Sequence, residues 1–396
     1  MANKKSGINV AVLIGIILIG AISRAPLTAV GTLVSNISAD MGLSSAAAGM
    51  ITTIPLLAFA FVSPFVTRIA KSYGYGRTLC CALIILAIGT AIRSLAGTPG
   101  VYIGTILMGI GIAFGNVLTP GIIKMKFPEQ VGLATGVYVA SLAVFSGIAA
   151  AVSVPVATLY SWKMALGMWV IVVAACLGWW MALSRGGLQE GSSDESANAE
   201  RKHSRSVYTY KMAYILAAYF GLQSILYYCF VAWLPTILVF KGYSQSGAGF
   251  YTTLNQMVGL PMAFFVPIVA AKLRNQKSLA LLVGVIYFIG MGILFACSSP
   301  VMMAVALGLC GLGAGASTSL VTVDITLRAS HGEIASELAG MSQLIGYILA
   351  AIGPTLLGRI YDSSGSWTVP IILMLVAIVI MTVVAFIAGR DVSVGE

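Results

Sequence analysis

The sequence predicts an all-α membrane protein with twelve transmembrane helices in two six-helix bundles. Three observations carry this prediction: the composition, the regular recurrence of long apolar segments, and a polar stretch that divides these segments six and six. Of the 396 residues, 59% are hydrophobic and 9% are charged, and the mean hydropathy is +0.98. A soluble domain carries about 25% charged residues, so the composition excludes a soluble protein.

The apolar segments have the length of membrane spans, since a helix needs about 20 apolar residues to cross a bilayer. Turn residues separate them, as in Thr98-Pro99-Gly100 and Ser298-Ser299-Pro300. The predicted spans are 8–36, 44–67, 78–97, 99–123, 133–158, 163–183, 209–239, 246–271, 278–298, 300–327, 334–357 and 367–389.

The first span carries an arginine and a proline near its centre, Arg24 and Pro26. A cation at this depth costs at least about 2.5–3.5 kcal/mol, so Arg24 needs a protein-lined, wet or anion-bearing surrounding. Pro26 removes one helix hydrogen bond and favours a kink. We expect a binding site on this helix. The alternative is an arginine that only anchors neighbouring carbonyl groups.

Residues 184–208 are polar, charged and rich in Gly and Ser, which predicts a flexible linker. The linker divides an N-terminal bundle, residues 1–183, from a C-terminal bundle, residues 209–396. Both termini and the linker are predicted to be cytoplasmic, because this orientation places only four Lys and Arg residues on the outer side and one, Arg24, within the membrane. The outer four are Arg93, Lys163, Lys241 and Arg359, and the remaining seventeen of the 22 Lys and Arg residues then lie inside, as the positive-inside rule requires.

The two halves of the chain repeat each other. The fourth span has a glycine run, Gly109 to Gly115, and the tenth has another, Gly311 to Gly315. The fifth and eleventh spans each place a glycine near the inner end, Gly136 and Gly340. Matches at the same span number and direction predict parallel repeats about an axis along the membrane normal. We interpret the glycines as sites of close helix packing.

Polar side chains inside the spans are the candidates for a binding cavity, because an unpaired polar group in hydrocarbon costs several kcal/mol. Overlaying the repeats at Val30 and Trp233 sets Tyr227 opposite Arg24. Arg24 would supply charge, Tyr227 and Gln343 hydrogen bonds, and Trp233 an apolar wall. The predicted substrate-binding residues are Arg24, Tyr227, Gln343, Trp233, Asn116, Tyr228, Asn255 and Tyr138.

Acidic groups are placed at span ends. Asp324 and Arg328 are four residues apart at the inner end of the tenth span, which favours a local salt bridge. No Asp, Glu or His falls at a predicted midplane, so carboxylate-coupled proton transport has no obvious carrier. The cysteines and histidines form no metal-ligand pattern, and we expect no metal and no cofactor.

Four stretches resemble patterns of a known family. Ser23-Arg24-Ala25-Pro26-Leu27-Thr28-Ala29-Val30-Gly31-Thr32-Leu33 is similar to the Asn-Leu-Arg-Pro-x-x-Thr-x-Val-Gly-Pro-Leu pattern of the cyanate/nitroimidazole porter family of the major facilitator superfamily. Tyr228-x-x-x-Ala232-Trp233-Leu234-Pro235 and Gln343-x-Ile345-Gly346 extend the similarity. The loop from Arg68 to Arg77 resembles the superfamily's cytoplasmic gating motif, which implies gating roles for Arg68, Lys71 and Arg77. The loop lacks the aspartate that the motif usually carries.

The resemblance implies a major facilitator fold and the transport of a small planar solute, such as cyanate or a nitro-heterocycle. We expect a non-enzymatic, monomeric transporter in the cytoplasmic membrane that moves an anionic or nitro-bearing small molecule by alternating access. Its partners would be this substrate and the lipid bilayer, with no nucleic acid. The alternative is a multidrug efflux transporter that binds hydrophobic compounds on its 15 Phe, 16 Tyr and 17 Met side chains.

Overall fold

The computed structural model describes residues 3–185 and 206–395, and these residues are mostly helical. Within them, twelve segments are long and apolar enough to cross a membrane, the sixth being built from α6 and α7. The long helices are α1 (Asn3–Met41), α2 (Ser45–Tyr73), α3 (Tyr75–Leu95), α4 (Gly97–Lys126), α5 (Val131–Leu159), α6 (Trp162–Gly167) with α7 (Trp169–Arg185), α9 (Lys211–Phe240), α10 (Gln245–Lys272), α11 (Lys277–Ala296), α12 (Pro300–Arg328), α13 (Gly332–Ser364) and α14 (Thr368–Ala388).

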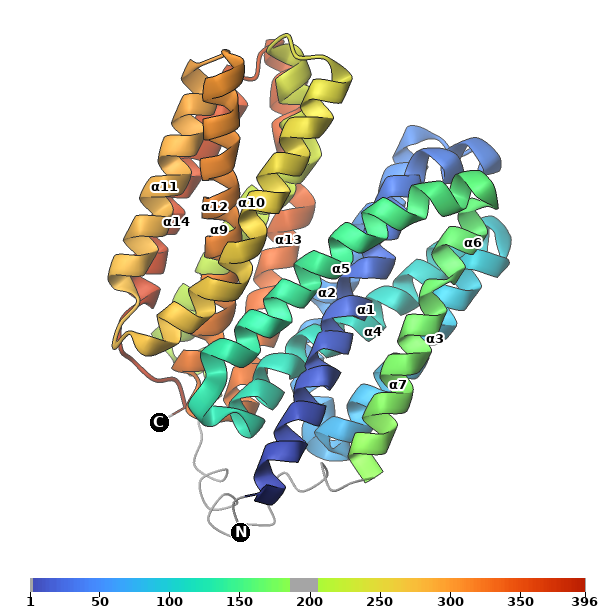
Figure 1. The fold of residues 1–396 in the computed structure, drawn as a ribbon, viewed down its shortest axis with the longest axis vertical. Coiled ribbons are helices and arrows are strands. Elements are labelled where there is room, and N and C mark those ends of the chain that lie inside the picture. Colours follow the sequence, from blue (N-terminus) through green and yellow to red (C-terminus); the bar gives the residue numbers. More distant parts are fainter. Residues whose placement is uncertain (1–2, 186–205, 396) are drawn as a thin grey trace.

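The helices form two bundles, α1 to α7 and α9 to α14, which meet at one end of the molecule and diverge at the other (Figure 1). We call the end where α1 begins and α14 ends the closed end, and the opposite end the open end. The predicted fold class is confirmed. Most of the predicted linker, residues 186–205, lies outside the described residues, and the domain boundaries stay a prediction.

Several helices extend beyond the predicted spans. The helix α2 continues to Tyr73, where hydropathy predicted an end at 67, and α13 continues to Ser364, where it predicted 357. Hydropathy marks where a segment leaves hydrocarbon, whereas a helix can continue into water with charged residues such as Lys71 and Arg359. These extensions place Lys71 beside the other bundle, as described below.

The glycine runs hold neighbouring helices at close distance, as predicted. A Cβ atom on Gly109 would lie 2.7 Å from the Cβ of Ala58 in α2, and one on Gly111 would lie 2.6 Å from the Cβ of Leu86 in α3. In the other bundle, a Cβ on Gly259 of α10 would lie 2.9 Å from the carbonyl oxygen of Gly311 in α12. Any larger residue would push these helices apart.

Among the contacts that join the bundles at the closed end, two occupy equivalent positions in the two halves, and we call these two the seams. In the α5–α10 seam, a Cβ on Gly136 would lie 2.6 Å from the carbonyl oxygen of Phe264. In the α2–α13 seam, a Cβ on Gly340 would lie 2.7 Å from the carbonyl oxygen of Ser63. The two glycines are the pair that the repeat predicted, so equivalent helices of each half build equivalent seams.

Charged side chains reinforce the α2–α13 seam. The Nζ of Lys71 lies 2.6 Å from a carboxylate oxygen of Glu337 and 3.5 Å from one of Glu333. Nearby, the hydroxyl group of Tyr75 donates a hydrogen bond to Ser336 at 3.2 Å. These contacts connect the two bundles across the closed end.

Two predictions about charged residues are wrong. Arg93, assigned to the outer surface, is 0% exposed because its side chain lies against α1 and α4, where it contacts Pro26 and Met108. The expected Asp324–Arg328 salt bridge is not formed within 4.0 Å. Arg328 donates instead to Gln276 and to the carbonyl oxygen of Ala388, while the buried carboxylate of Asp324 has no hydrogen-bond partner.

We predict that Gly340→Ala destabilises the closed end. The added methyl group would overlap the backbone of Ser63, which cannot rotate away as a side chain could. Overpacking of this kind costs about 1–3 kcal/mol, so the population should shift toward a form with the closed end parted. Spin labels at Ser72 and Arg274, in a background without the native cysteines, should report a longer distance between the bundles.

The matched control is Gly178→Ala in α7, since a Cβ at Gly178 meets no atom within 4 Å. This variant should leave the label distance unchanged. An unchanged distance in Gly340→Ala as well would contradict the proposed role of the seam.

Candidate binding cavity

A cavity of about 630 Å³ lies between the two bundles. Helices α1, α4 and α5 line it from one bundle, and α9, α10, α12 and α13 line it from the other. It extends from Ala339 and Ile325, near the closed end, to Ala151 and Thr252, in the halves of α5 and α10 nearer the open end. Ligand pockets for small molecules typically measure about 300–1,000 Å³.

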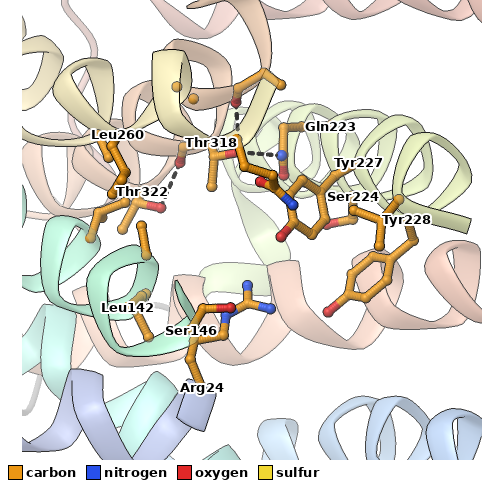
Figure 2. A pocket seen from close by; sticks show the side chains of 18 of the residues that line it. Arg24, Leu142, Ser146, Gln223, Ser224, Tyr227, Tyr228, Leu260, Thr318 and Thr322 are labelled. Atoms are coloured by element: carbon orange, nitrogen blue, oxygen red, sulfur yellow. Dashed lines mark hydrogen bonds between the residues drawn. The ribbon is translucent and has the colours of Figure 1, made fainter. Parts of the chain in front are cut away.

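Arg24 enters the cavity from α1, with Gln223, Tyr227 and Tyr228 on the opposite side (Figure 2). The Cζ of its half-buried side chain lies 5.9 Å from the centre of the Tyr227 ring, which is the pairing that the repeat predicted. Among the described residues, no carboxylate oxygen lies within 4.0 Å of its guanidinium group. The cavity therefore holds a positive charge without a permanent counter-ion.

Two hydrogen bonds orient amide side chains at the cavity wall. The hydroxyl group of Tyr138 donates to Oδ1 of Asn116 at 3.0 Å, and the hydroxyl group of Ser63 donates to Oε1 of Gln343 at 3.2 Å. Each bond occupies the amide oxygen and leaves the NH2 group as the atom that can contact a ligand. Together with Arg24, these groups give the cavity hydrogen-bond donors.

A cluster of polar side chains from the C-terminal bundle also lines the cavity. Gln223 donates to the hydroxyl of Thr318, and the hydroxyl of Thr322 donates to the carbonyl oxygen of Thr318 at 2.8 Å, as Figure 2 shows. Across the cavity, the hydroxyl groups of Thr28 and Ser146 are hydrogen-bonded at 2.8 Å. The sequence did not single out Thr28, Ser146 or Thr322 for the cavity, because single Ser and Thr residues in membrane helices usually bond to their own backbone.

The structure brings together seven of the eight residues predicted to bind substrate. The residues that line the cavity are Arg24, Asn116, Tyr138, Tyr227, Tyr228, Asn255 and Gln343. Trp233 does not line it, and its prediction as an apolar wall is wrong. Its indole packs against Trp367, at 5.3 Å between ring centres, and donates to the carbonyl oxygen of Pro354 at 2.8 Å. Its side chain therefore faces α13 and the start of α14, whereas Val231, two residues earlier in α9, faces the cavity.

The three predicted gating residues have different surroundings in the structure. Lys71 forms the inter-bundle ion pairs with Glu333 and Glu337, whereas Arg68 and Arg77 are exposed. Lys71 lies on the last turn of α2, one face of which packs against α13. The geometry supports a gating role for Lys71 and assigns no inter-bundle contact to the other two.

Comparisons with known proteins are consistent with this architecture. The model of the Major Facilitator Superfamily matches residues 12–354. The chain is 37% identical over 379 residues to the uncharacterized transporter YycB of Bacillus subtilis (strain 168), covering 95% of this chain and 93% of that one. It is 34% identical over 392 residues to the 2-nitroimidazole transporter of Escherichia coli (strain K12), covering 98% and 97%.

A third relative, the cyanate transport protein CynX of Escherichia coli (strain K12), is 27% identical over 361 residues. The alignment covers 90% of this chain and 91% of that one. Two solved structures share the fold. The proton:xylose symporter XylE superposes with a TM-score of 0.70 at 15% identity, over 97% of this chain and 94% of its own. The fucose:proton symporter FucP of E. coli superposes with 0.71 at 12% identity, over 95% and 99%.

We predict that Tyr138→Phe weakens ligand binding several-fold. The variant removes the hydroxyl group that fixes the amide of Asn116, and one such hydrogen bond contributes about 0.5–1.5 kcal/mol. Calorimetric titration of purified protein with the solutes named for the two Escherichia coli relatives, 2-nitroimidazole and cyanate, would measure the change. Tyr160→Phe, at an exposed tyrosine near the open end, is the control, and equal affinities in the two variants would contradict the assignment.

We predict that Lys71→Glu parts the closed end and that adding Glu337→Lys partly restores it. The single reversal replaces attraction by repulsion in the α2–α13 seam, and the double reversal makes an ion pair of opposite sense. Partly exposed ion pairs contribute about 0.2–1 kcal/mol, so the shift should be moderate. The Ser72–Arg274 label distance measures it. Lys163→Glu, near the open end, should have no effect; failure of the double variant to recover would contradict the pairing.

Proposed function

The chain belongs to the major facilitator superfamily and, within it, to the family of the cyanate and nitroimidazole porters. From this premise we propose that it transports a small planar solute that bears a negative charge or a nitro group. The observation that carries the proposal is the guanidinium group of Arg24, which lines the inter-bundle cavity without a carboxylate partner. A solute of complementary charge would compensate it.

The chemistry of the cavity supports an anionic or nitro group as the recognised feature. A guanidinium group is a planar fork whose N–H groups match two oxygen atoms of a carboxylate or nitro group. The amide NH2 groups of Asn116 and Gln343 are further donors, since their oxygens are already bonded. A site rich in donors favours a ligand that presents acceptors and disfavours a ligand that presents cations.

The aromatic side chains support a planar ligand. The rings of Phe220, Tyr227 and Tyr347 line the cavity, and those of Phe220 and Tyr347 lie 5.9 Å apart at nearly right angles. Flat conjugated molecules pack on such rings with little loss of conformational entropy. The 2-nitroimidazole and cyanate transporters named above are described as moving solutes of this flat, polar kind.

The architecture supports alternating access. The cavity lies between two bundles that, in the described residues, meet mainly through the seams and neighbouring closed-end contacts, so rocking of one bundle against the other would expose the cavity to each side in turn. The bias of Lys and Arg toward the loops of the closed end supports a cytoplasmic closed end. In that orientation both termini are cytoplasmic and the described form faces outward.

Multidrug efflux is the competing function. The aromatic residues of the cavity would suit hydrophobic drugs, but among the residues that line the cavity the single charged side chain is Arg24. A pump for lipophilic cations needs an anionic or acceptor-rich surface, because a fixed cation repels such compounds. The charge of the cavity therefore favours the anion or nitro-compound transporter.

We predict that Arg24→Ala reduces the affinity for cyanate or 2-nitroimidazole about 10- to 150-fold. A hydrogen bond to a charged group contributes about 1.5–3 kcal/mol, which corresponds to this range. Arg24→Lys should recover only part of the affinity, because an ammonium group keeps the charge and loses the fork. Binding is measured by calorimetry and by the rise in melting temperature on ligand addition.

Arg359→Ala, which removes an exposed arginine at the open end of α13, is the matched control and should bind like the wild type. Cationic dyes should not compete with the ligand. Equal affinity in the wild type and in Arg24→Ala, or displacement by cationic dyes, would contradict the proposed substrate class and favour drug efflux.

A further inference from the structure

A second arginine, Arg93, is buried in the N-terminal bundle near the segment that carries Arg24. It lies in the last turn of α3 and is 0% exposed. Its Nη1 donates to the carbonyl oxygen of Pro26 in α1 at 3.1 Å and contacts the sulfur of Met108 in α4 at 3.0 Å. Its Nε and Nη2 atoms have no hydrogen-bond partner. The side chain of Arg93 thus links α3 to both α1 and α4, and its main polar contact is a single backbone carbonyl.

Arg93 is costly for folding, which indicates a role other than stability. Removing a guanidinium group from water is unfavourable unless a carboxylate and a full set of acceptors replace the water, and neither is present among the described residues. An apolar side chain of similar length would fill the same space without this penalty. Ionisable residues buried in membrane proteins are usually kept for function.

We propose that Arg93 is a positioning residue for Arg24: it holds the carbonyl of Pro26 and thereby fixes the part of α1 that presents the Arg24 guanidinium group to the cavity. The proposal rests on the proposed function, in which Arg24 binds the solute. Arg24 and Pro26 are two residues apart, so they lie about 200° apart around the helix. Arg24 therefore faces the cavity while Pro26 faces the interior of its own bundle.

The segment needs an external contact because its own hydrogen bonding is incomplete. Pro26 has no N–H group, so the carbonyl of Ile22, four residues earlier, lacks its helical donor. A helix weakened at this point can bend or rotate about it. The Arg93 contact lies four residues beyond Ile22 and restrains the helix on the far side of the weak point.

The base of the Arg93 side chain is itself fixed. A Cβ on Gly104 of α4 would lie 2.7 Å from the Cβ of Arg93, and a Cβ on Gly89, one turn earlier in α3, would lie 2.6 Å from the backbone nitrogen of Met108. The helices α3 and α4 are therefore in close contact at Arg93 and one turn before it. They form a rigid pair that transmits its position through Arg93 to α1.

The first arm of the test compares Arg93→Met and Arg93→Lys. Arg93→Met keeps the length of the side chain and removes the donors, so we expect an equal or higher melting temperature and about 10-fold weaker binding of cyanate or 2-nitroimidazole. Arg93→Lys keeps a donor that can reach Pro26 and should restore most of the affinity. The control is Ser94→Ala, whose hydroxyl group bonds only within α3, to the carbonyl oxygen of Thr90.

The second arm is a double-mutant cycle. In an Arg24→Ala background, Arg93→Met should have little further effect on binding, since Arg93 acts through Arg24. Additive losses would overturn the proposal, as would a lower melting temperature with unchanged affinity in Arg93→Met. If Arg24→Ala alone left binding unchanged, the proposed function would fail independently of Arg93.

The third arm requires no substrate. Thr28, one turn after Arg24, lines the cavity, and a cysteine placed there in a background without native cysteines reports the orientation of α1. Its rate of modification by a negatively charged methanethiosulfonate should change at least about 3-fold in Arg93→Met and not in Ser94→Ala. An unchanged rate would overturn the positioning role whatever the substrate is.

Discussion

An arginine charge without a permanent counter-ion, held at a cavity between two bundles, is the constraint on which the rest of the structure depends. Because the charge of Arg24 is costly in a low-dielectric region, the surrounding protein must either neutralise it or keep it accessible to polar partners. The structure keeps it accessible: the ring of Tyr227 faces the guanidinium group, and the amide groups of Asn116 and Gln343 are oriented as donors. The cavity is therefore prepared for a ligand that completes it.

The Ser63–Gln343 hydrogen bond connects this cavity to the closed end. Gln343 lines the cavity, while Ser63 belongs to the other bundle and contacts Gly340 one turn earlier in α13. A ligand that contacts the amide of Gln343 thus acts on a residue that also belongs to the α2–α13 seam. In the proposed function, substrate recognition and separation of the bundles would share one side chain, which is how a carrier can couple occupancy to its conformational change.

The sequence was sufficient to predict the twelve spans, the equivalent positions of Gly136 and Gly340 in the two halves, and the approach of Tyr227 to Arg24. Hydropathy and internal repetition record these features directly. It was insufficient for Arg93, Trp233 and Asp324. Whether a charged or aromatic side chain near a span end is exposed or buried depends on which neighbouring helices pack against it, and hydropathy does not record these neighbours. Arg93 was assigned to water because it lies at a span end, where charges are usually exposed.

The two seams are unequal in chemical character. The α2–α13 seam contains the ion pairs of Lys71 with Glu333 and Glu337, whereas in the described part of the chain no ion pair joins α5 to α10, which meet through Gly136 and the Phe264 backbone. Dissolved salt screens the first seam and leaves the second nearly unaffected. The order in which the two seams separate should therefore depend on ionic strength. The salt concentration at the closed end thus sets which seam separates first.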